Sequence, residues 1–218
     1  MATLRDIKRK IAAVRKTRQI TRAMNMVAAA KLRKVQGRME GFGPYARKFA
    51  EVMANLSQRV EADIHPLLVP RESVTNVELM VFTADRGLCG SFNNNLITRA
   101  EKWIKELERK GIKISLVCIG KKARDYFVKR GYNVRESHVY VYGKVDISFI
   151  NDLSRKMINR YLQGETDEVH MLFMEFVSMA RQVPKFVKLI PIERQREDEV
   201  ITAARTEYLF EPSPEELV

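Results

Sequence analysis

The sequence is poor in cysteine and histidine and has no long hydrophobic run. Among 218 residues there are two cysteines and three histidines, and none of them stands at a spacing typical of a metal site or a paired-cysteine motif. We therefore expect reduced thiols at Cys89 and Cys118, no disulfide framework and no bound metal. Because no stretch reaches about 18 apolar residues, no membrane-spanning helix is predicted.

Glycine and proline are also scarce, which excludes a chain that is disordered throughout. With 10 glycines, 7 prolines and 45% hydrophobic residues, the composition is that of a folded protein with a core. The first residues, Met1 to Asp6, contain neither an apolar signal core nor a serine-rich leader. The simplest interpretation is synthesis and residence in a bacterial-type cytoplasm.

Acidic residues are nearly absent from the first part of the chain. Residues 1–48 hold fourteen basic and two acidic residues, whereas residues 49–218 hold twenty-five of each, so the first segment accounts for the whole net charge of +12. The sequence thus predicts a neutral body that carries a strongly positive arm.

The arm, residues 1–65, is predicted to be a long helical shaft. A heptad pattern of apolar residues runs along it, with a polar middle; its apolar positions are Leu4, Ile7, Ile11, Val14, Ala28, Leu32, Val35, Met39 and Phe42. A second stripe covers the polar middle, and we attribute this shift to the drift of a 3.6-residue helix against a 3.5-residue repeat; it comprises Ile20, Ala23, Met24, Val27 and Ala30. Thr3 is the expected N-cap, and residues 41–44 predict a kink or a short break.

Residues 70–192 are predicted to form an α/β domain. Strands are expected at 77–83, 113–119, 137–142, 169–177 and 186–191, and helices at 93–110, 121–130 and 146–163. This alternation favours a mostly parallel sheet with helices on its faces. Residues 193–218 are expected to be a tail leading into a helix that begins near Ser213 and runs out of sequence about one turn later.

Motifs for catalysis or nucleotide binding are missing. The segment from Gly87 to Phe92 does not fit G-x-G-x-x-G, and Gly120-Lys121 lacks the other residues of a P-loop. No catalytic triad stands out, so we predict no catalytic residue and no cofactor. Cys89 could be a reactive thiol, but a small residue in a tight turn is the favoured interpretation.

The segment Thr83 to Asn93 joins a strand end to a helix start and contains two glycines. It is interpreted either as a contact or ligand loop at the carboxyl end of a strand, or as a turn that needs positive φ. The pattern alone does not separate these two interpretations.

Two segments resemble one protein family. Both Ile11 to Leu32 (IAAVRKTRQITRAMNMVAAAKL) and Asp85 to Asn93 (DRGLCGSFN) are similar to segments of the gamma subunits of bacterial F-type ATP synthases, and Tyr208 to Pro212 (YLFEP) is a weaker match. The resemblance implies a long helix that is half of an antiparallel coiled coil, joined to a Rossmann-like α/β foot with a mostly parallel sheet. The family's long C-terminal helix has no counterpart here, so we expect a truncated chain that assembles poorly by itself.

The same resemblance implies a central stalk rotor, which couples proton-driven rotation to ATP synthesis without being catalytic itself. Its implied partners are three alpha and three beta subunits, the epsilon subunit and the membrane rotor ring of c subunits, at the cytoplasmic face of the bacterial plasma membrane. The residues implied to contact the alpha/beta ring are Arg9, Arg15, Lys16, Arg18, Met24, Lys31, Asp85, Arg86 and Cys89. Those implied to contact epsilon or the rotor ring are Tyr208, Phe210 and Glu211.

Two alternatives remain open from the residues. A basic helix in a chain of pI about 9.8 is also typical of nucleic-acid-binding proteins, although the heptad register and the lack of interleaved aromatic residues favour helix pairing. An α/β enzyme with a helical extension is the second alternative, against which the missing motifs weigh.

Overall fold

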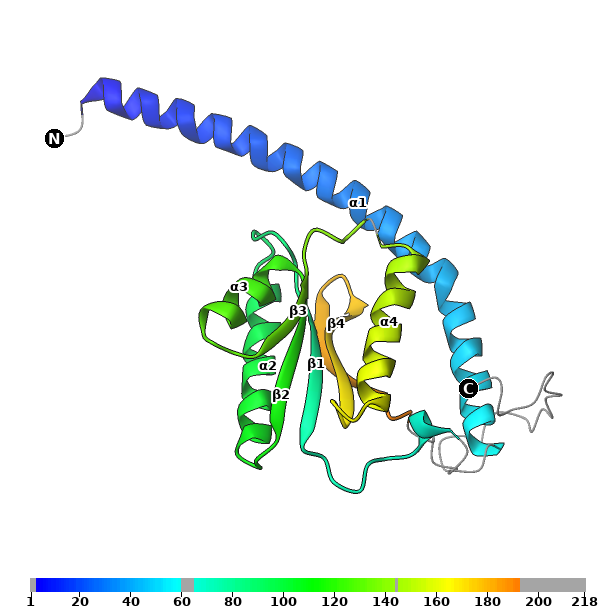
Figure 1. Ribbon diagram of the computed structural model, residues 1–218. Helices are drawn as coiled ribbons and strands as arrows, with labels where there is room; N and C mark the ends of the chain where they lie inside the picture. Colours follow the sequence, from blue (N-terminus) through cyan, green and yellow to red (C-terminus); the bar gives the residue numbers. More distant parts are fainter. Residues whose placement is uncertain (1–2, 60–64, 144, 193–218) are drawn as a thin grey trace. The chain divides into compact units, whose positions relative to one another are not determined.

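The computed structural model describes residues 3–59, 65–143 and 145–192 (Figure 1). The chain divides into two compact units, Met1–Leu56 and Ser57–Val218. Each unit is described by itself. No helix in the described part of the chain is long and apolar enough to cross a membrane.

The first unit is formed by the helix α1, Leu4–Arg59, whose last residues, 57–59, are counted with the second unit. Thr3 caps it as predicted, because its hydroxyl accepts a hydrogen bond from Asp6 N (3.4 Å) while Asp6 Oδ2 accepts one from Thr3 N (3.1 Å). The hydrogen bond from the Thr3 hydroxyl lowers the pKa of the Asp6 carboxyl. The short break considered at residues 41–44 is wrong, since the helix continues through them with Pro44 inside. A kink there stays a prediction, because proline removes a backbone hydrogen bond from a helix interior.

The second unit is built on one five-stranded sheet of order β3-β2-β1-β4-β5. β1 pairs in parallel with both β2 and β4, and β2 pairs in parallel with β3. Only β5 is antiparallel, and it forms a hairpin with β4. The prediction of a mostly parallel sheet is thereby confirmed. The strands are β1 Asn76–Phe82, β2 Lys113–Ile119, β3 Val134–His138, β4 Glu168–Ser178 and β5 Arg181–Ile190.

Three helices connect these strands, namely α2 Phe92–Glu108, α3 Lys121–Lys129 and α4 Ile147–Leu162, and one turn of 3₁₀ helix, η1 Pro66–Leu68, precedes β1. α2, α3 and α4 lie where helices were predicted, whereas no helix was predicted at η1. The third strand is displaced, because it was predicted at 137–142 and ends at His138. Tyr140 has φ 59°, a left-handed conformation that no strand residue adopts, and this ends the extended run despite its apolar sequence.

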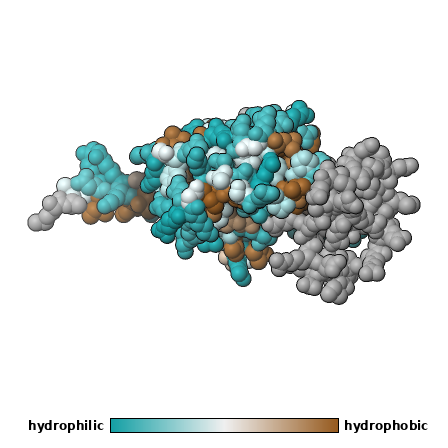
Figure 2. Space-filling model, turned by 60° about the horizontal axis from the view of Figure 1, so that its bottom comes forward, coloured by the Kyte–Doolittle hydropathy of each residue, from teal (hydrophilic) through white to brown (hydrophobic). Residues whose placement is uncertain are grey.

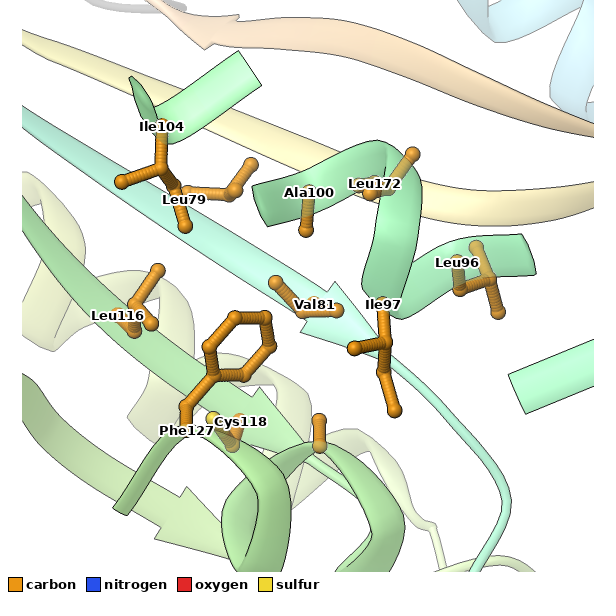
Figure 3. Close-up of a cluster of buried hydrophobic side chains, with 11 residues drawn as sticks. Leu79, Val81, Leu96, Ile97, Ala100, Ile104, Leu116, Cys118, Phe127 and Leu172 are labelled. Carbon is orange, nitrogen blue, oxygen red and sulfur yellow. The ribbon is translucent and has the colours of Figure 1, made fainter. Parts of the chain in front are cut away.

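The core forms two layers, one on each face of the sheet. α2 and α3 cover one face, where Leu79 and Val81 of β1 pack with Ile97, Ile104 and Phe127 (Figure 3). α4 covers the other face with Leu153, Met157 and Tyr161. The connecting helices change from one face of the sheet to the other because the chain adds β2 and β3 on one side of β1 and then places β4 on the other side. The carboxyl ends of β1 and β4 therefore meet at a topological switch point, where ligand sites of open α/β sheets occur.

Asp167 holds together two strands of this sheet at their amino ends. Its Oδ2 accepts hydrogen bonds from Thr75 N (2.8 Å), Asn76 N (2.8 Å) and Thr75 Oγ1 (3.0 Å), which ties the start of β4 to the start of β1. Burial alone would raise the pKa of Asp167, but these hydrogen bonds outweigh burial and lower it. Because the pKa of Asp167 is lower in the folded than in the unfolded chain, its carboxylate stabilises the fold at pH values above about 3.9, the pKa of an unperturbed aspartate. This stabilisation is lost as the pH falls through the pKa of the folded state.

We expect Asp167→Asn to lower the free energy of unfolding by about 2 kcal/mol at pH 7, since charge-assisted hydrogen bonds contribute roughly 1.5–3 kcal/mol. The loss should shrink as the pH is lowered from 5 toward 3. Urea unfolding across this pH range measures it. Asp152→Asn is the control, because the Asp152 side chain is 64% exposed and pairs with Lys156 at the surface. Equal stability of wild type and Asp167→Asn at pH 7 would contradict this role.

Candidate functional site

The connection between β1 and α2, residues 83–91, lies at the switch point. It begins at the buried Thr83, whose Oγ1 accepts a hydrogen bond from Ala123 N at 2.8 Å. The phenol of Tyr142 donates a hydrogen bond to Thr83 O at 2.7 Å. Burial, and then the charge of Asp85, raise the pKa of Tyr142 to about 12, so this phenol stays a neutral donor at ordinary pH. The start of the loop is thus held from two sides.

Asp85 joins three connections of the sheet. Its Oδ1 accepts hydrogen bonds from Lys121 N (2.9 Å), at the start of α3, and from Tyr140 N (3.0 Å), just after β3. The residue is half-buried. Its carboxylate therefore fixes the loops that follow β1, β2 and β3 against one another, a supporting role that the sequence pattern did not indicate.

Asn93, in the first turn of α2, closes the loop from its other end. Its Oδ1 accepts a hydrogen bond from Ala84 N at 2.9 Å, and its Nδ2 lies 3.0 Å from Cys89 Sγ and 3.4 Å from Arg86 O. The side chain is buried. Sequence reasoning missed it, although a buried amide at a helix start beside a glycine-rich turn is a recognisable signal for loop closure.

The tip of the loop projects fully into solvent. Residues Arg86 to Gly90 are all exposed, and Leu88 is 95% exposed. Leu88 also has φ 61°, a left-handed conformation that costs a branched residue about 1–2 kcal/mol. A firmly supported loop that presents an exposed leucine in a strained conformation favours the contact interpretation over that of a simple turn.

We expect Leu88→Gly to raise the free energy of unfolding by about 1 kcal/mol, because glycine adopts positive φ without strain. If a partner protein buries Leu88 on binding, the same change should weaken that binding by about tenfold, since burying a leucine contributes roughly 1.5–3 kcal/mol. Urea unfolding and calorimetric titration measure the two effects. A variant that is both less stable and unchanged in binding would refute this interpretation of Leu88.

The two cysteines differ in environment. Cys89 is exposed in the loop, whereas Cys118 is buried in β2. Burial raises the pKa of Cys118 to about 12, which leaves that thiol protonated and inert. No group of His, Cys, Asp or Glu side chains within the described ranges could hold a metal ion.

The six predicted contact residues of the arm are all exposed on α1. At about 100° per residue, Arg9, Lys16, Met24 and Lys31 fall within an arc of roughly 80° and share one face, whereas Arg15 and Arg18 do not. We call Arg9, Lys16 and Lys31 the basic face. In the described part of the chain, no carboxylate lies within salt-bridge distance of any basic side chain between Arg5 and Arg47. The helix therefore presents an uncompensated positive field.

The apolar residues of α1 are exposed too. Ile11, Val14, Ile20 and Val27 are 48%, 63%, 54% and 56% exposed. Figure 2 shows hydrophobic side chains along one side of the N-terminal part of this helix, opposite hydrophilic ones. The drift explanation for the second stripe is wrong, because drift amounts to only about 20° per heptad, whereas Ile20 and Val27 lie about 180° from the stripe of Ile11 and Val14. The apolar face of the middle of α1 therefore lies opposite the stripe of Ile11 and Val14, on the same side of the helix as the basic face.

The structure brings Asp85, Arg86 and Cys89 together in one loop, and places the six predicted residues of the arm in the other unit. Tyr208, Phe210 and Glu211 lie outside the described residues. Besides Asn93, sequence reasoning missed the role of Leu88 at the tip of the loop and that of Gly120, at which a β-carbon would lie 1.9 Å from Thr83 O.

The sequence matches known families over nearly its whole length. A family model described as ATP synthase matches residues 3–218. The ATP synthase gamma chain of Syntrophobacter fumaroxidans is 50% identical over 219 residues, which cover 100% of this chain and 75% of the relative. The gamma chain of Syntrophus aciditrophicus is 44% identical with the same coverage. These matches give no support to the nucleic-acid-binding alternative.

Solved structures share the fold. The rotor of the Euglena gracilis mitochondrial ATP synthase contains a chain with a TM-score of 0.60 and 19% identity, covering 96% of this chain and 71% of that one. The central stalk and c-ring structure of the Tetrahymena thermophila enzyme contains one with a TM-score of 0.58 and 22% identity, covering 79% and 72%. A long N-terminal helix followed by a mostly parallel α/β domain is common to them.

Proposed function

Since the chain belongs to the family of ATP synthase gamma chains, we propose that it is the central stalk rotor of a proton-translocating ATP synthase. Its relatives are non-catalytic subunits, so its task is to couple rotation to ATP synthesis at a ring of three alpha and three beta subunits. The observation that carries this proposal is the 50% identity over the full length of the chain to a gamma chain.

A rotor needs a stiff, asymmetric body that offers different contacts to otherwise equivalent sites. A partner shifts a conformational equilibrium only through contacts that differ between the two states. α1 is asymmetric in this sense, because its basic face, with Ile20 and Val27, lies opposite the stripe of Ile11 and Val14. Each orientation of such a helix presents the surrounding ring with a different combination of charge and apolar surface.

The unpaired charge suits a contact that must slide. An uncompensated field acts over about 10 Å at ordinary salt and steers acidic groups without locking them. We propose that Arg9, Lys16, Met24 and Lys31 face acidic loops of the ring from one side of α1, and that Arg15 and Arg18 meet the ring from other sides of the helix. At the other unit, Arg86, Leu88 and Cys89 would meet the ring, while Asp85 holds their loop in place.

The stripe of Ile7, Ile11 and Val14 would be covered by a second helix in an antiparallel coiled coil, because exposed apolar residues at heptad spacing are typical of such pairing. The α/β unit would bind the epsilon subunit and rest on the membrane rotor ring of c subunits, with Tyr208, Phe210 and Glu211 near that ring. The location would be the cytoplasmic face of the bacterial plasma membrane, with peripheral attachment.

Titration of the purified chain against an isolated alpha/beta ring, and separately against the epsilon subunit, tests the proposal. We expect tight binding to epsilon and weaker binding to the ring that falls steeply as salt rises, because the field of α1 is screened. Double-stranded DNA of random sequence serves as the control ligand. Binding to DNA in preference to both subunits would refute the assignment.

A further inference from the structure

A groove lies on one side of the N-terminal part of α1. It encloses about 560 Å³ and is lined by six exposed residues, Lys8, Ile11, Ala12, Arg15, Lys16 and Gln19. Ala12 has the shortest side chain of the six, so it forms the floor beside the apolar Ile11. The two lysines and Arg15 form the walls. The groove is therefore apolar at its base and cationic at its rim.

The three cations of this groove have no acidic neighbour. In the described part of the chain, no carboxylate lies within salt-bridge distance of Lys8, Arg15 or Lys16. Asp6 is the only acidic residue before Glu40, and its Oδ2 accepts hydrogen bonds from Thr3 N (3.1 Å) and Thr3 Oγ1 (2.6 Å). The groove thus complements a ligand that supplies its own negative charges.

The apolar floor and the cationic walls together fit carboxylate side chains better than bare phosphate groups. The methylene stem of a glutamate can lie on Ala12 and Ile11 while its carboxylate reaches the cations. Arg15 can bind a carboxylate through two parallel hydrogen bonds, and the lysines add point charges. Because Lys8 and Arg15 are seven residues apart, about 10 Å along the helix axis, two carboxylates fit at once. The expected occupant is a peptide segment with at least two glutamates.

The groove and the basic face lie on different sides of α1. At about 100° per residue, the centre of the groove lies roughly 100° from the centre of the basic face, and Lys16 stands on the border between them. Three equivalent subunits around a three-fold axis are 120° apart. Two neighbouring subunits of the proposed ring can therefore each offer an acidic segment to a different side of the same helix.

We propose that the groove over Ala12 binds a glutamate-containing segment of one subunit of the alpha/beta ring while the basic face meets the equivalent segment of a neighbouring subunit. This inference rests on the proposed rotor function, and it adds Lys8 to the residues that contact the ring. Two segments bound to one helix reinforce each other, because binding of the first places the second at a high effective concentration. Loss of the groove alone should therefore weaken ring binding strongly, although the basic face remains.

The test fills the groove and, separately, removes one of its walls. Ala12→Leu fills it without changing the charge, and Lys8→Gln removes one cation. Leucine and glutamine are good helix formers, so α1 should stay helical, which circular dichroism checks. Each variant of the full chain is titrated by calorimetry against the isolated alpha/beta ring at low salt. We expect Ala12→Leu to weaken ring binding at least tenfold and Lys8→Gln to weaken it about fivefold.

Matched controls make the same changes outside the groove. Ala23→Leu adds a leucine on the same side of α1, about three turns further along, and Lys10→Gln removes one charge from the opposite side. Both controls should bind the ring within twofold of wild type. Equal losses for Lys8→Gln and Lys10→Gln would show that net charge alone governs binding. That result would overturn the inference, as would a helical Ala12→Leu variant that binds the ring like wild type.

Competition identifies the class of ligand. A hexaglutamate peptide should displace the ring from the wild-type chain and should do so less effectively from Ala12→Leu, whereas inorganic tripolyphosphate should not distinguish the two. Displacement by tripolyphosphate that Ala12→Leu abolishes, with none by the peptide, would make the groove a phosphate site and refute the proposed occupant. A wild-type chain that does not bind the ring at all would instead refute the rotor function itself.

Discussion

Gly120→Ala is expected to lower the free energy of unfolding by about 4 kcal/mol, because both backbone strain and a steric clash oppose a side chain at this position. Gly120 precedes α3 with φ 107°, where a β-carbon is strained by roughly 1–3 kcal/mol. A β-carbon at this position would also lie 1.9 Å from Thr83 O, a backbone atom that cannot move freely. The absence of a side chain at Gly120 allows the ends of β1 and β2 to lie close together. A β-carbon would therefore add a steric clash to the backbone strain.

Gly111→Ala is the matched control for this prediction. Gly111 also has positive φ (79°), but a β-carbon there meets nothing within 4 Å. Its replacement should therefore cost only the conformational strain, about 1 kcal/mol. Urea unfolding at constant m-value compares the two variants. Equal losses would show that the contact with Thr83 does not determine the need for glycine at position 120.

The joint replacement of Arg9, Lys16 and Lys31 by glutamate is expected to weaken binding of the alpha/beta ring by about 100-fold at low salt. The three changes reverse the sign of the basic face, and electrostatic steering contributes roughly 10- to 1000-fold to association rates. Glutamate forms helices about as well as lysine and arginine, so α1 should remain helical. Titrations at several salt concentrations measure the effect, and the steep salt dependence should disappear as well.

A control with the same change in net charge separates local from global electrostatics. Lys102, Lys110 and Lys129 are exposed on the α/β unit, and their joint replacement by glutamate should reduce ring binding by less than about fivefold, because these lysines are not part of the basic face. If this control lost as much affinity as the α1 variant, net charge and not the basic face would govern the contact. Epsilon binding should be unaffected in both.

The local patterns were sufficient for most of the fold. Period-two and period-3.6 alternation located the strands and helices of the α/β unit, because burial of one face imposes that alternation on the sequence. The third strand was misplaced, since Tyr140 and Tyr142 have strand-like side chains while Tyr140 adopts positive φ. The second apolar stripe of α1 is a separate face of the helix, because Ile11 and Ile20 lie about 180° apart around its axis, and helix drift does not explain it.

By itself, the sequence determined the long basic helix, the α/β class, the absence of catalytic motifs and the position of the glycine-containing loop after β1, because charge and periodicity are properties of neighbouring residues. Only the tertiary structure decided that Asp85 supports the loop and that Leu88 projects from it. The partners of Asp85 lie 36 and 55 residues away, at Lys121 and Tyr140. These contacts, like the proximity of Phe82 and Phe173, depend on the order of the strands, in which β4 pairs with β1 on the side opposite β2. No local sequence pattern specifies that order.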